Sequence, residues 1–120
     1  MNMNFVFVGI GGVFGSLLRY ELGKVISKKY SANFPVGTFI INITGAIILG
    51  IVSGLGVSKD MYLLLGEGFL GAYTTFSTFM YEGFNLFQGK ESLNAIIYIL
   101  GSLILGIIGY TLGFCICSFI

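Results

Sequence analysis

Long apolar stretches dominate this sequence and most constrain its fold. They run roughly over residues 5–22, 35–57, 61–87 and 93–120. Each can cross a bilayer as a helix, which takes about 20 mostly apolar residues. Because a membrane-spanning segment must satisfy its own backbone hydrogen bonds, helices are expected, and the alternating strands of a β-barrel are not seen. The pattern predicts an all-α membrane protein with four transmembrane helices in a single domain, 1–120.

The composition also indicates a membrane environment. Apolar residues make up 56% of the chain and charged residues only 9%, whereas a soluble domain has about 25% charged residues. The lipid bilayer must therefore cover most of the surface. Six scattered cations form no patch for nucleic acid. The spacing of Cys115 and Cys117 fits neither a zinc site nor a redox motif, and the N-terminus lacks the positive region of a signal peptide, so we expect a retained first span.

The connections carry most of the cations and predict an orientation. With four spans, the first and third connections lie on the same side of the membrane. That side carries five cations, namely Arg19, Lys24, Lys28, Lys29 and Lys90, whereas the other side carries only Lys59. The positive-inside rule then favours both termini outside. In the first connection, Asn33 is expected to cap the second helix, with Pro35 in its first turn.

Glycine is abundant and recurs at a spacing of four residues. The pairs are Gly11 with Gly15, Gly50 with Gly54, and Gly109 with Gly113. Small residues at this spacing let helices approach closely in lipid. Packing between helices of one chain is the simpler explanation, but so many glycines also suggest contact with a further chain.

Hydroxyl residues crowd the middle of the third apolar stretch, in the segment GAYTTFSTF from Gly71 to Phe79. They could bond back to preceding carbonyls, which helices tolerate. Alternatively, the helix breaks here, and its freed backbone groups line a site that protein or water covers. On a helix, Phe76 and Phe79 would share one face.

Two further sets of polar residues lie at membrane depth. Thr38 and Asn42 share a face of the second helix, and Tyr98, Ser102 and Gly106 form a row on the last. Asn42 could serve as an interhelical hydrogen bond or as part of a polar path. A path of amide and hydroxyl donors without a central cation favours a small anion over a cation, and the positive edges of phenylalanine rings add to this.

Two acidic residues of the third stretch are also candidates. Two roles stay open for Glu67 and Glu82: a functional role, as intramembrane carboxylates often have, or a place at the two membrane interfaces. Glu82 is expected near a helix C-terminus, where the helix dipole disfavours it. We therefore expect it to have a partner such as Lys or Arg.

The sequence resembles the Fluc/CrcB family of fluoride channels over almost its whole length. The similarity lies in GGVFGSLLRY (11–20), PVGTFIINITG (35–45), GAYTTFSTF (71–79) followed by MYEG, and Tyr98 with Ser102. The resemblance implies a fluoride-selective channel in the plasma membrane of a prokaryote, which lets fluoride leave the cell passively. It also implies an antiparallel dimer of four-helix subunits with the third helix broken near its middle.

The same resemblance implies roles for individual residues. Backbone carbonyls of Gly71 and Thr74 would hold a structural sodium ion at the dimer interface. Phe76 and Phe79 would face fluoride in the pore, and Arg19 would lie near the aqueous vestibule. The remaining residues of the polar track would be Asn42, Ser77, Thr78, Tyr98 and Ser102.

Several alternatives stay open at this stage. The imbalance of cations suits a subunit with one orientation, so a heterodimer with a paired homologue stands beside an antiparallel homodimer. A small multidrug-type proton-coupled transporter would have to use Glu67. This chain has no acidic residue inside its first span, where Glu21 stands only at the end, and it lacks Trp. A structural membrane subunit without transport is a third possibility. An enzyme is not expected, because the spans lack His and a nucleophile–base arrangement.

Overall fold

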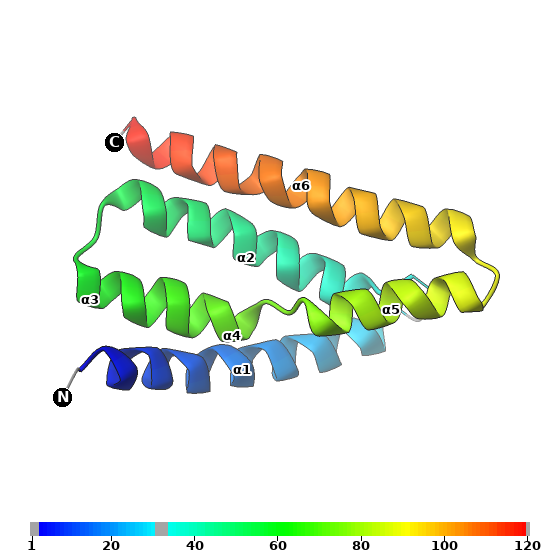
Figure 1. The fold of residues 1–120 in the computed structure, drawn as a ribbon, viewed down its shortest axis with the longest axis horizontal. Helices are drawn as coiled ribbons and strands as arrows, with labels where there is room; N and C mark the ends of the chain where they lie inside the picture. Colours follow the sequence, from blue (N-terminus) through cyan, green and yellow to red (C-terminus); the bar gives the residue numbers. More distant parts are fainter. Residues whose placement is uncertain (1–2, 31–33, 120) are drawn as a thin grey trace.

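The computed structural model describes residues 3–30 and 34–119, and most of these residues form helices (Figure 1). The elements are α1 (Asn4–Lys29), α2 (Val36–Leu55), α3 (Lys59–Tyr62), the π-helix η1 (Leu63–Leu70), α4 (Gly71–Tyr73), α5 (Ser77–Gln88) and α6 (Ser92–Ser118). No strand occurs in these ranges, which confirms the all-α prediction.

Three of the helices are long and apolar enough to cross a membrane, namely α1, α2 and α6. The third predicted span consists of α3, η1, α4 and α5, which follow one another as a single bent helix interrupted at residues 74–76. The molecule measures 49 Å along its longest axis, compared with about 40–45 Å for a bilayer with its headgroups. These features support a multi-pass membrane protein.

The first helix is longer than the sequence suggested. We expected it to end near residue 22, but α1 continues to Lys29. Lys24 pairs with Glu21 at 3.5 Å and its amine lies 4.9 Å from the centre of the Tyr20 ring. Lys28 and Lys29 occupy the last turn, where cations favour the helix dipole. Charged residues therefore extend this helix rather than end it.

The second helix begins directly after proline. Pro35 immediately precedes the first helical residue, Val36, where the missing N–H of proline costs little. The cap predicted at Asn33 lies outside the described residues.

Glycines bring α1 against the third helix. A Cβ added to Gly11 would collide with the backbone oxygen of Leu64, and one added to Gly15 with that of Phe69. Only glycine permits backbones to approach this closely, as small-residue packing in membranes requires. This glycine pair therefore packs two helices of the same chain.

The other two glycine pairs join α2 to α6. Gly50 lies against the carbonyl of Tyr110, Gly54 against that of Phe114, and Gly113 against that of Ile47. A Cβ on Gly109 would come within 2.7 Å of the Ile47 side chain. Packing within one chain thus accounts for all three pairs, and none of them requires a further chain.

A π-helix that was not predicted from the sequence precedes the interruption. The N–H of Gly71 bonds to the carbonyl of Gly66, five residues earlier, and also to that of Gly68. Such π-helical turns are rare in proteins, and those that occur often lie at functional sites. The irregular backbone of the third helix therefore begins before residue 74.

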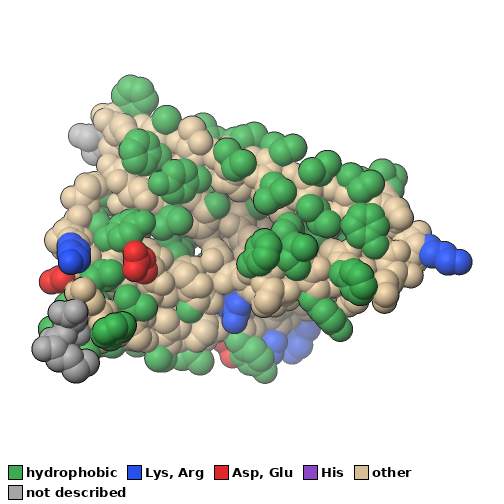
Figure 2. Space-filling view, in the orientation of Figure 1, with side chains coloured by type: hydrophobic (Ala, Val, Ile, Leu, Met, Phe, Trp, Pro, Cys, Tyr) green, Lys and Arg blue, Asp and Glu red, His purple; other side chains and the backbone are tan. Residues whose placement is uncertain are grey.

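The interruption separates two hydrophobic clusters. One contains Ile41, Val52, Leu70 and Tyr73, and the other contains Phe79, Leu86, Ala95 and Tyr98. Outside these clusters, large apolar side chains face outward, and Figure 2 shows them spread over the whole visible face with few charged side chains between them. Such a surface is suited to lipid and protein contacts rather than to water.

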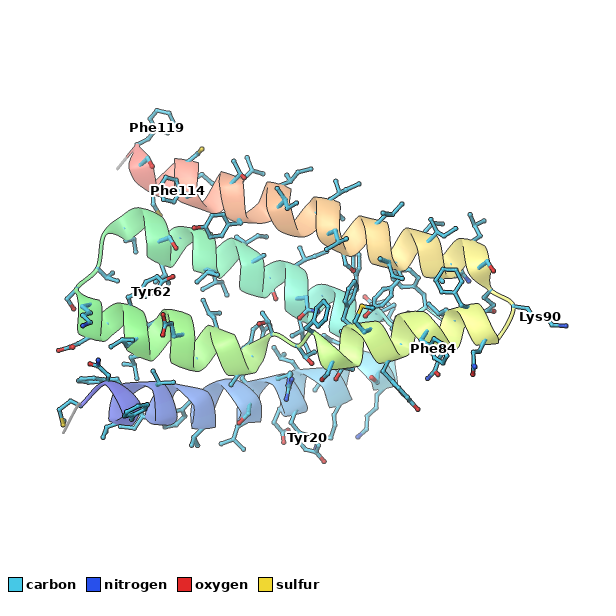
Figure 3. All side chains as sticks on the ribbon, in the orientation of Figure 1. Tyr20, Tyr62, Phe84, Lys90, Phe114 and Phe119 are labelled. Carbon is cyan, nitrogen blue, oxygen red and sulfur yellow. The ribbon has the colours of Figure 1, made fainter. Side chains whose placement is uncertain are left out.

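Lys90 and Lys59 lie at opposite ends of the molecule. Figure 3 shows Lys90 at the end where α5 turns into α6, opposite Phe119 at the end of α6. Both marked chain ends and the start of α3, with Lys59, lie at the Phe119 end (Figure 1). This arrangement keeps the predicted separation of Lys90 from Lys59.

Candidate functional site

The broken segment is held by the side chain of Asn42. Its Nδ2 donates to the carbonyl of Thr75 at 2.9 Å, and its Oδ1 accepts from the N–H of Thr75, also at 2.9 Å. The amide thus pairs with both backbone polar groups of one residue, Thr75, and replaces the hydrogen bonds that a continuous helix would supply to them. Asn42 therefore forms hydrogen bonds between the second and third helices, which is the simpler of the two roles considered from sequence; the other was a place in a polar path.

The same segment leaves two carbonyls without their usual helical donors. In a continuous helix the carbonyl of Gly71 would accept from the N–H of Thr75, but that N–H bonds to Asn42. The carbonyl of Thr74 would accept from the N–H of Thr78, which instead lies 3.3 Å from the Thr75 hydroxyl. The interruption therefore releases the two carbonyls that the resemblance connects with sodium.

The hydroxyls of the segment have different surroundings. Thr74 bonds back to the carbonyl of Leu70 at 2.9 Å, as hydroxyls in helices often do. Thr75 accepts from the first turn of α5, in the manner of an N-cap. Ser77 and Thr78 are exposed. Thr74 therefore fits the first interpretation, in which a hydroxyl bonds back to a preceding carbonyl. The interruption at residues 74–76 fits the second interpretation, a broken helix.

A small hollow lies beside the interruption. It has a volume of about 250 Å³ and is lined by Asn42, Thr74, Thr75, Phe76, Phe79, Ser102 and Leu103. The ring centres of Phe76 and Phe79 are 6.1 Å apart. Phe76 is 72% exposed, whereas Phe79 is only 5% exposed. The hollow therefore brings together five predicted site residues: Thr74, predicted to bind sodium, and the four predicted pore residues Asn42, Phe76, Phe79 and Ser102.

The hydroxyl of Ser102 has no partner in this hollow. Within residues 3–30 and 34–119, its Oγ is the buried side-chain polar atom that makes no hydrogen bond. An unsatisfied buried hydroxyl is costly and usually has an explanation such as a bound molecule or ion. The lining of the hollow thus includes a buried hydroxyl whose hydrogen-bonding capacity is unused.

A larger vestibule of about 1010 Å³ lies next to the interruption. Arg19, Lys24, Thr38, Thr78 and Glu82 are among its lining residues, and Thr75 lines both the vestibule and the hollow. Arg19 lines this cavity, and its role beside the aqueous entrance of a pore stays a prediction. The structure places Thr78 there as well, whereas Ser77 lines neither cavity.

Glu82 has a partner, as expected, but the prediction that this partner is Lys or Arg was wrong. The helix α5 ends at Gln88, so Glu82 lies inside it rather than at its C-terminus. Instead of Lys or Arg, the hydroxyl of Tyr98 donates to its Oε1 at 3.3 Å. Tyr98 is fully buried, lines neither cavity and contacts the Phe79 ring at 5.2 Å. Tyr98 therefore contacts one residue that lines the vestibule, Glu82, and one that lines the hollow, Phe79.

Glu67 is separate from this arrangement. It lies in η1, is exposed and lines neither cavity. In the part of the chain that the structure describes, Glu67 forms no ion pair. The structure therefore does not associate this carboxylate with the polar residues at the interruption.

Comparisons with known proteins find relatives along almost the whole chain. Residues 6–114 match the family model described as CrcB-like protein, Camphor Resistance (CrcB). The fluoride-specific ion channel FluC 2 of Clostridium acetobutylicum is 59% identical over 111 residues, which cover 92% of this chain and 95% of the relative. FluC 2 of Bacillus cereus is 42% identical over 92% of this chain and 94% of its own length. FluC 1 of Carboxydothermus hydrogenoformans is 36% identical over 98% and 95%, respectively.

Proposed function

Because this chain belongs to the CrcB family, as the resemblance in its motifs indicated, we propose that it is a fluoride-selective ion channel. The relatives named above are fluoride-specific ion channels. Membership of the family also confirms the expectation of a channel rather than an enzyme.

The unpaired hydroxyl of Ser102 is the observation that carries this proposal. Fluoride is a small anion that accepts hydrogen bonds, and the buried Oγ of Ser102 is a donor without a partner. The Asn42 amide has two N–H groups, of which one bonds to Thr75. Ser102 and Asn42 would replace part of the hydration shell of the ion in the hollow.

The two phenylalanines complete the proposed pore. Phe76 and Phe79 line the hollow, and the edge of an aromatic ring carries partial positive charge. Since no Lys or Arg among the described residues lines the hollow, an anion there would be attracted without being held by a full charge. Conduction requires such a balance. Arg19, which lines the vestibule, would raise the local concentration of anions.

The proposed physiological role is passive export of fluoride across the plasma membrane of a prokaryote. A bacterial strain without its own fluoride channel provides the test. Expression of this chain should let the strain grow at fluoride concentrations that otherwise stop it, while Ser102→Ala should give little protection. Full-length chain in the membrane without any gain in fluoride tolerance would argue against the role.

The residues present fit a structural sodium ion. No group of three His, Cys, Asp or Glu side chains is found within the described ranges, so a cation would need backbone oxygens. The carbonyls of Gly71 and Thr74 would supply them, since their usual donors bond elsewhere and unwound backbone carbonyls are known sodium ligands in membrane proteins. When bound, the ion would supply positive charge that neutralises these dipoles and would not be transported.

The proposed assembly is an antiparallel dimer. It would be either a homodimer or a heterodimer with a paired homologue. The five-to-one distribution of cations suits a subunit with one orientation, as the heterodimer requires. A reporter fused to the C-terminus distinguishes the two. Reporters on both faces of the membrane would favour the homodimer, whereas reporters on one face only would favour the paired homologue.

The competing function is a proton-coupled transporter of the small multidrug type that uses Glu67. It would require export of an organic cation driven by a proton gradient and abolished by Glu67→Gln. The exposed position of Glu67, outside both cavities, does not favour it. Fluoride flux that persists in Glu67→Gln without a proton gradient would reject it.

A further inference from the structure

Aromatic rings form a continuous row between the hollow and the vestibule. The row runs from Phe76 to Phe79, Tyr98 and Phe34, with successive ring centres 6.1, 5.2 and 5.4 Å apart. Phe76 and Phe79 line the hollow, and Phe34 lines the vestibule. Tyr98 lies between them and is fully buried.

Phe34 is the member of this row without an assigned role. It stands just before α2, and its ring meets the Tyr98 ring edge-on at an interplanar angle of 90°. It also contacts Phe39 at 5.6 Å and 70°. Edge-to-face contacts of this kind fix the relative orientation of aromatic rings. The contacts therefore restrict how the Tyr98 ring can tilt.

The position of the Tyr98 ring matters because its hydrogen bond is long. The Tyr98 hydroxyl lies 3.3 Å from Glu82 Oε1, beyond the usual range of about 2.5–3.0 Å for such bonds. A small tilt of the ring would lengthen this contact until it no longer counts as a hydrogen bond. Glu82 lines the vestibule, so its carboxylate would then be released beside the route of an anion.

We propose that Phe34 is a positioning residue for ion passage, whose ring holds Tyr98 so that the tyrosine hydroxyl keeps Glu82 in place. The inference rests on the proposed function as a fluoride channel. Loss of the Phe34 ring lets Tyr98 tilt, and a released Glu82 carboxylate then opposes anions between the vestibule and the hollow. Phe34 acts through Tyr98 and need not touch the ion.

The first test replaces the ring and measures fluoride efflux from liposomes. Phe34→Leu removes the ring and should lower the flux roughly two- to tenfold, the range that an edge-to-face aromatic contact supports. Phe34→Tyr keeps the ring and should restore the flux. The matched control is Phe114→Leu, which removes a ring stacked on Tyr110 at 6.4 Å and outside both cavities. It should leave the flux unchanged.

A double-mutant cycle separates positioning from general packing. Tyr98→Phe keeps the ring but removes the hydroxyl that bonds to Glu82. If Phe34 acts through that hydroxyl, Phe34→Leu should cause no further loss in the Tyr98→Phe background. A merely structural contribution would lower the flux by the same factor in both backgrounds. If Phe34→Leu does not reach the membrane, Phe34→Met takes its place in the cycle.

The outcomes distinguish this inference from the function on which it rests. Two results would overturn the role of Phe34 alone, provided that the wild type conducts fluoride. One is an equal loss of flux from Phe34→Leu in the wild-type and Tyr98→Phe backgrounds, and the other is no loss of flux in Phe34→Leu. The wild-type protein is assayed in the oligomeric form that it has in the membrane. If it shows no fluoride flux, the proposed function and this inference are overturned together.

Discussion

Asn42 and Thr75 form two hydrogen bonds with each other, each 2.9 Å long, across the gap between α2 and the broken third helix. The side-chain amide of Asn42 takes the place of a backbone partner for Thr75. As a result, the N–H of Thr75 does not close the helical turn onto Gly71. This one pairing thus stabilises the interruption and also leaves a backbone carbonyl available.

Asn42→Ala should therefore destabilise the broken segment. Loss of both bonds leaves the N–H and carbonyl of Thr75 without partners, at a cost of about 1–3 kcal/mol. Equilibrium unfolding in detergent with rising denaturant measures this change. Asn42→Ser, which retains a polar side chain but cannot pair with both groups, should be intermediate or equally unstable. Unchanged stability in Asn42→Ala would mean that the two bonds do not hold the interruption.

Ser102→Ala should separate stability from transport. The Ser102 hydroxyl is buried without a partner, so its removal should leave the free energy of unfolding unchanged or raise it. Fluoride flux should fall about tenfold or more, because a hydrogen bond to a charged group contributes about 1.5–3 kcal/mol. Ser118→Ala is the control, since that hydroxyl bonds to the Phe114 carbonyl at 2.9 Å and lines neither cavity. Full flux through Ser102→Ala would remove this hydroxyl from the pore.

Phe76 and Phe79 should respond differently to replacement by isoleucine. Phe76→Ile and Phe79→Ile should both reduce fluoride flux, because each removes a ring from the hollow. Only Phe79→Ile should also lower stability, by about 1 kcal/mol or more, since Phe79 is buried against Tyr98 whereas Phe76 is 72% exposed. Flux and unfolding measured on the same preparations test this. Normal flux in both variants would show that the rings serve packing alone.

Gly15→Ala should weaken the packing of α1 on the third helix. The new methyl group would collide with the carbonyl of Phe69, and overpacking of this kind costs about 1–3 kcal/mol. Gly9→Ala is the matched control on the same helix, because no atom lies within 4 Å of its added Cβ. It should be neutral or slightly stabilising, as alanine favours helix over glycine. Equal unfolding midpoints for the two variants would contradict the close contact.

Local patterns were enough to predict much of this fold. Apolar length predicted helical spans, and the four-residue spacing of Gly11 with Gly15 indicated close packing, which the structure shows against Leu64 and Phe69. The crowding of hydroxyls in the third span indicated an interruption, which lies at residues 74–76. In each case the cause is a property of neighbouring residues, so it is visible in the sequence.

The remaining features depend on residues that are distant in the sequence. The partner of Asn42 is 33 residues away and that of Glu82 is 16 residues away, so neither pairing follows from local spacing. The expectation of a cationic partner for Glu82 overlooked Tyr98 for this reason. Phe34 was likewise missed, because an aromatic residue before a proline carries no signal of its contact with Tyr98.

The ratio of fluoride to chloride efflux is the measurement that tests the central claim most directly. The chain is purified in the oligomeric form found in the membrane and reconstituted into liposomes loaded with both ions, and each ion is followed with its own electrode. The account predicts rapid release of fluoride while chloride stays inside. Comparable release of the two anions, or no release of either, would contradict it.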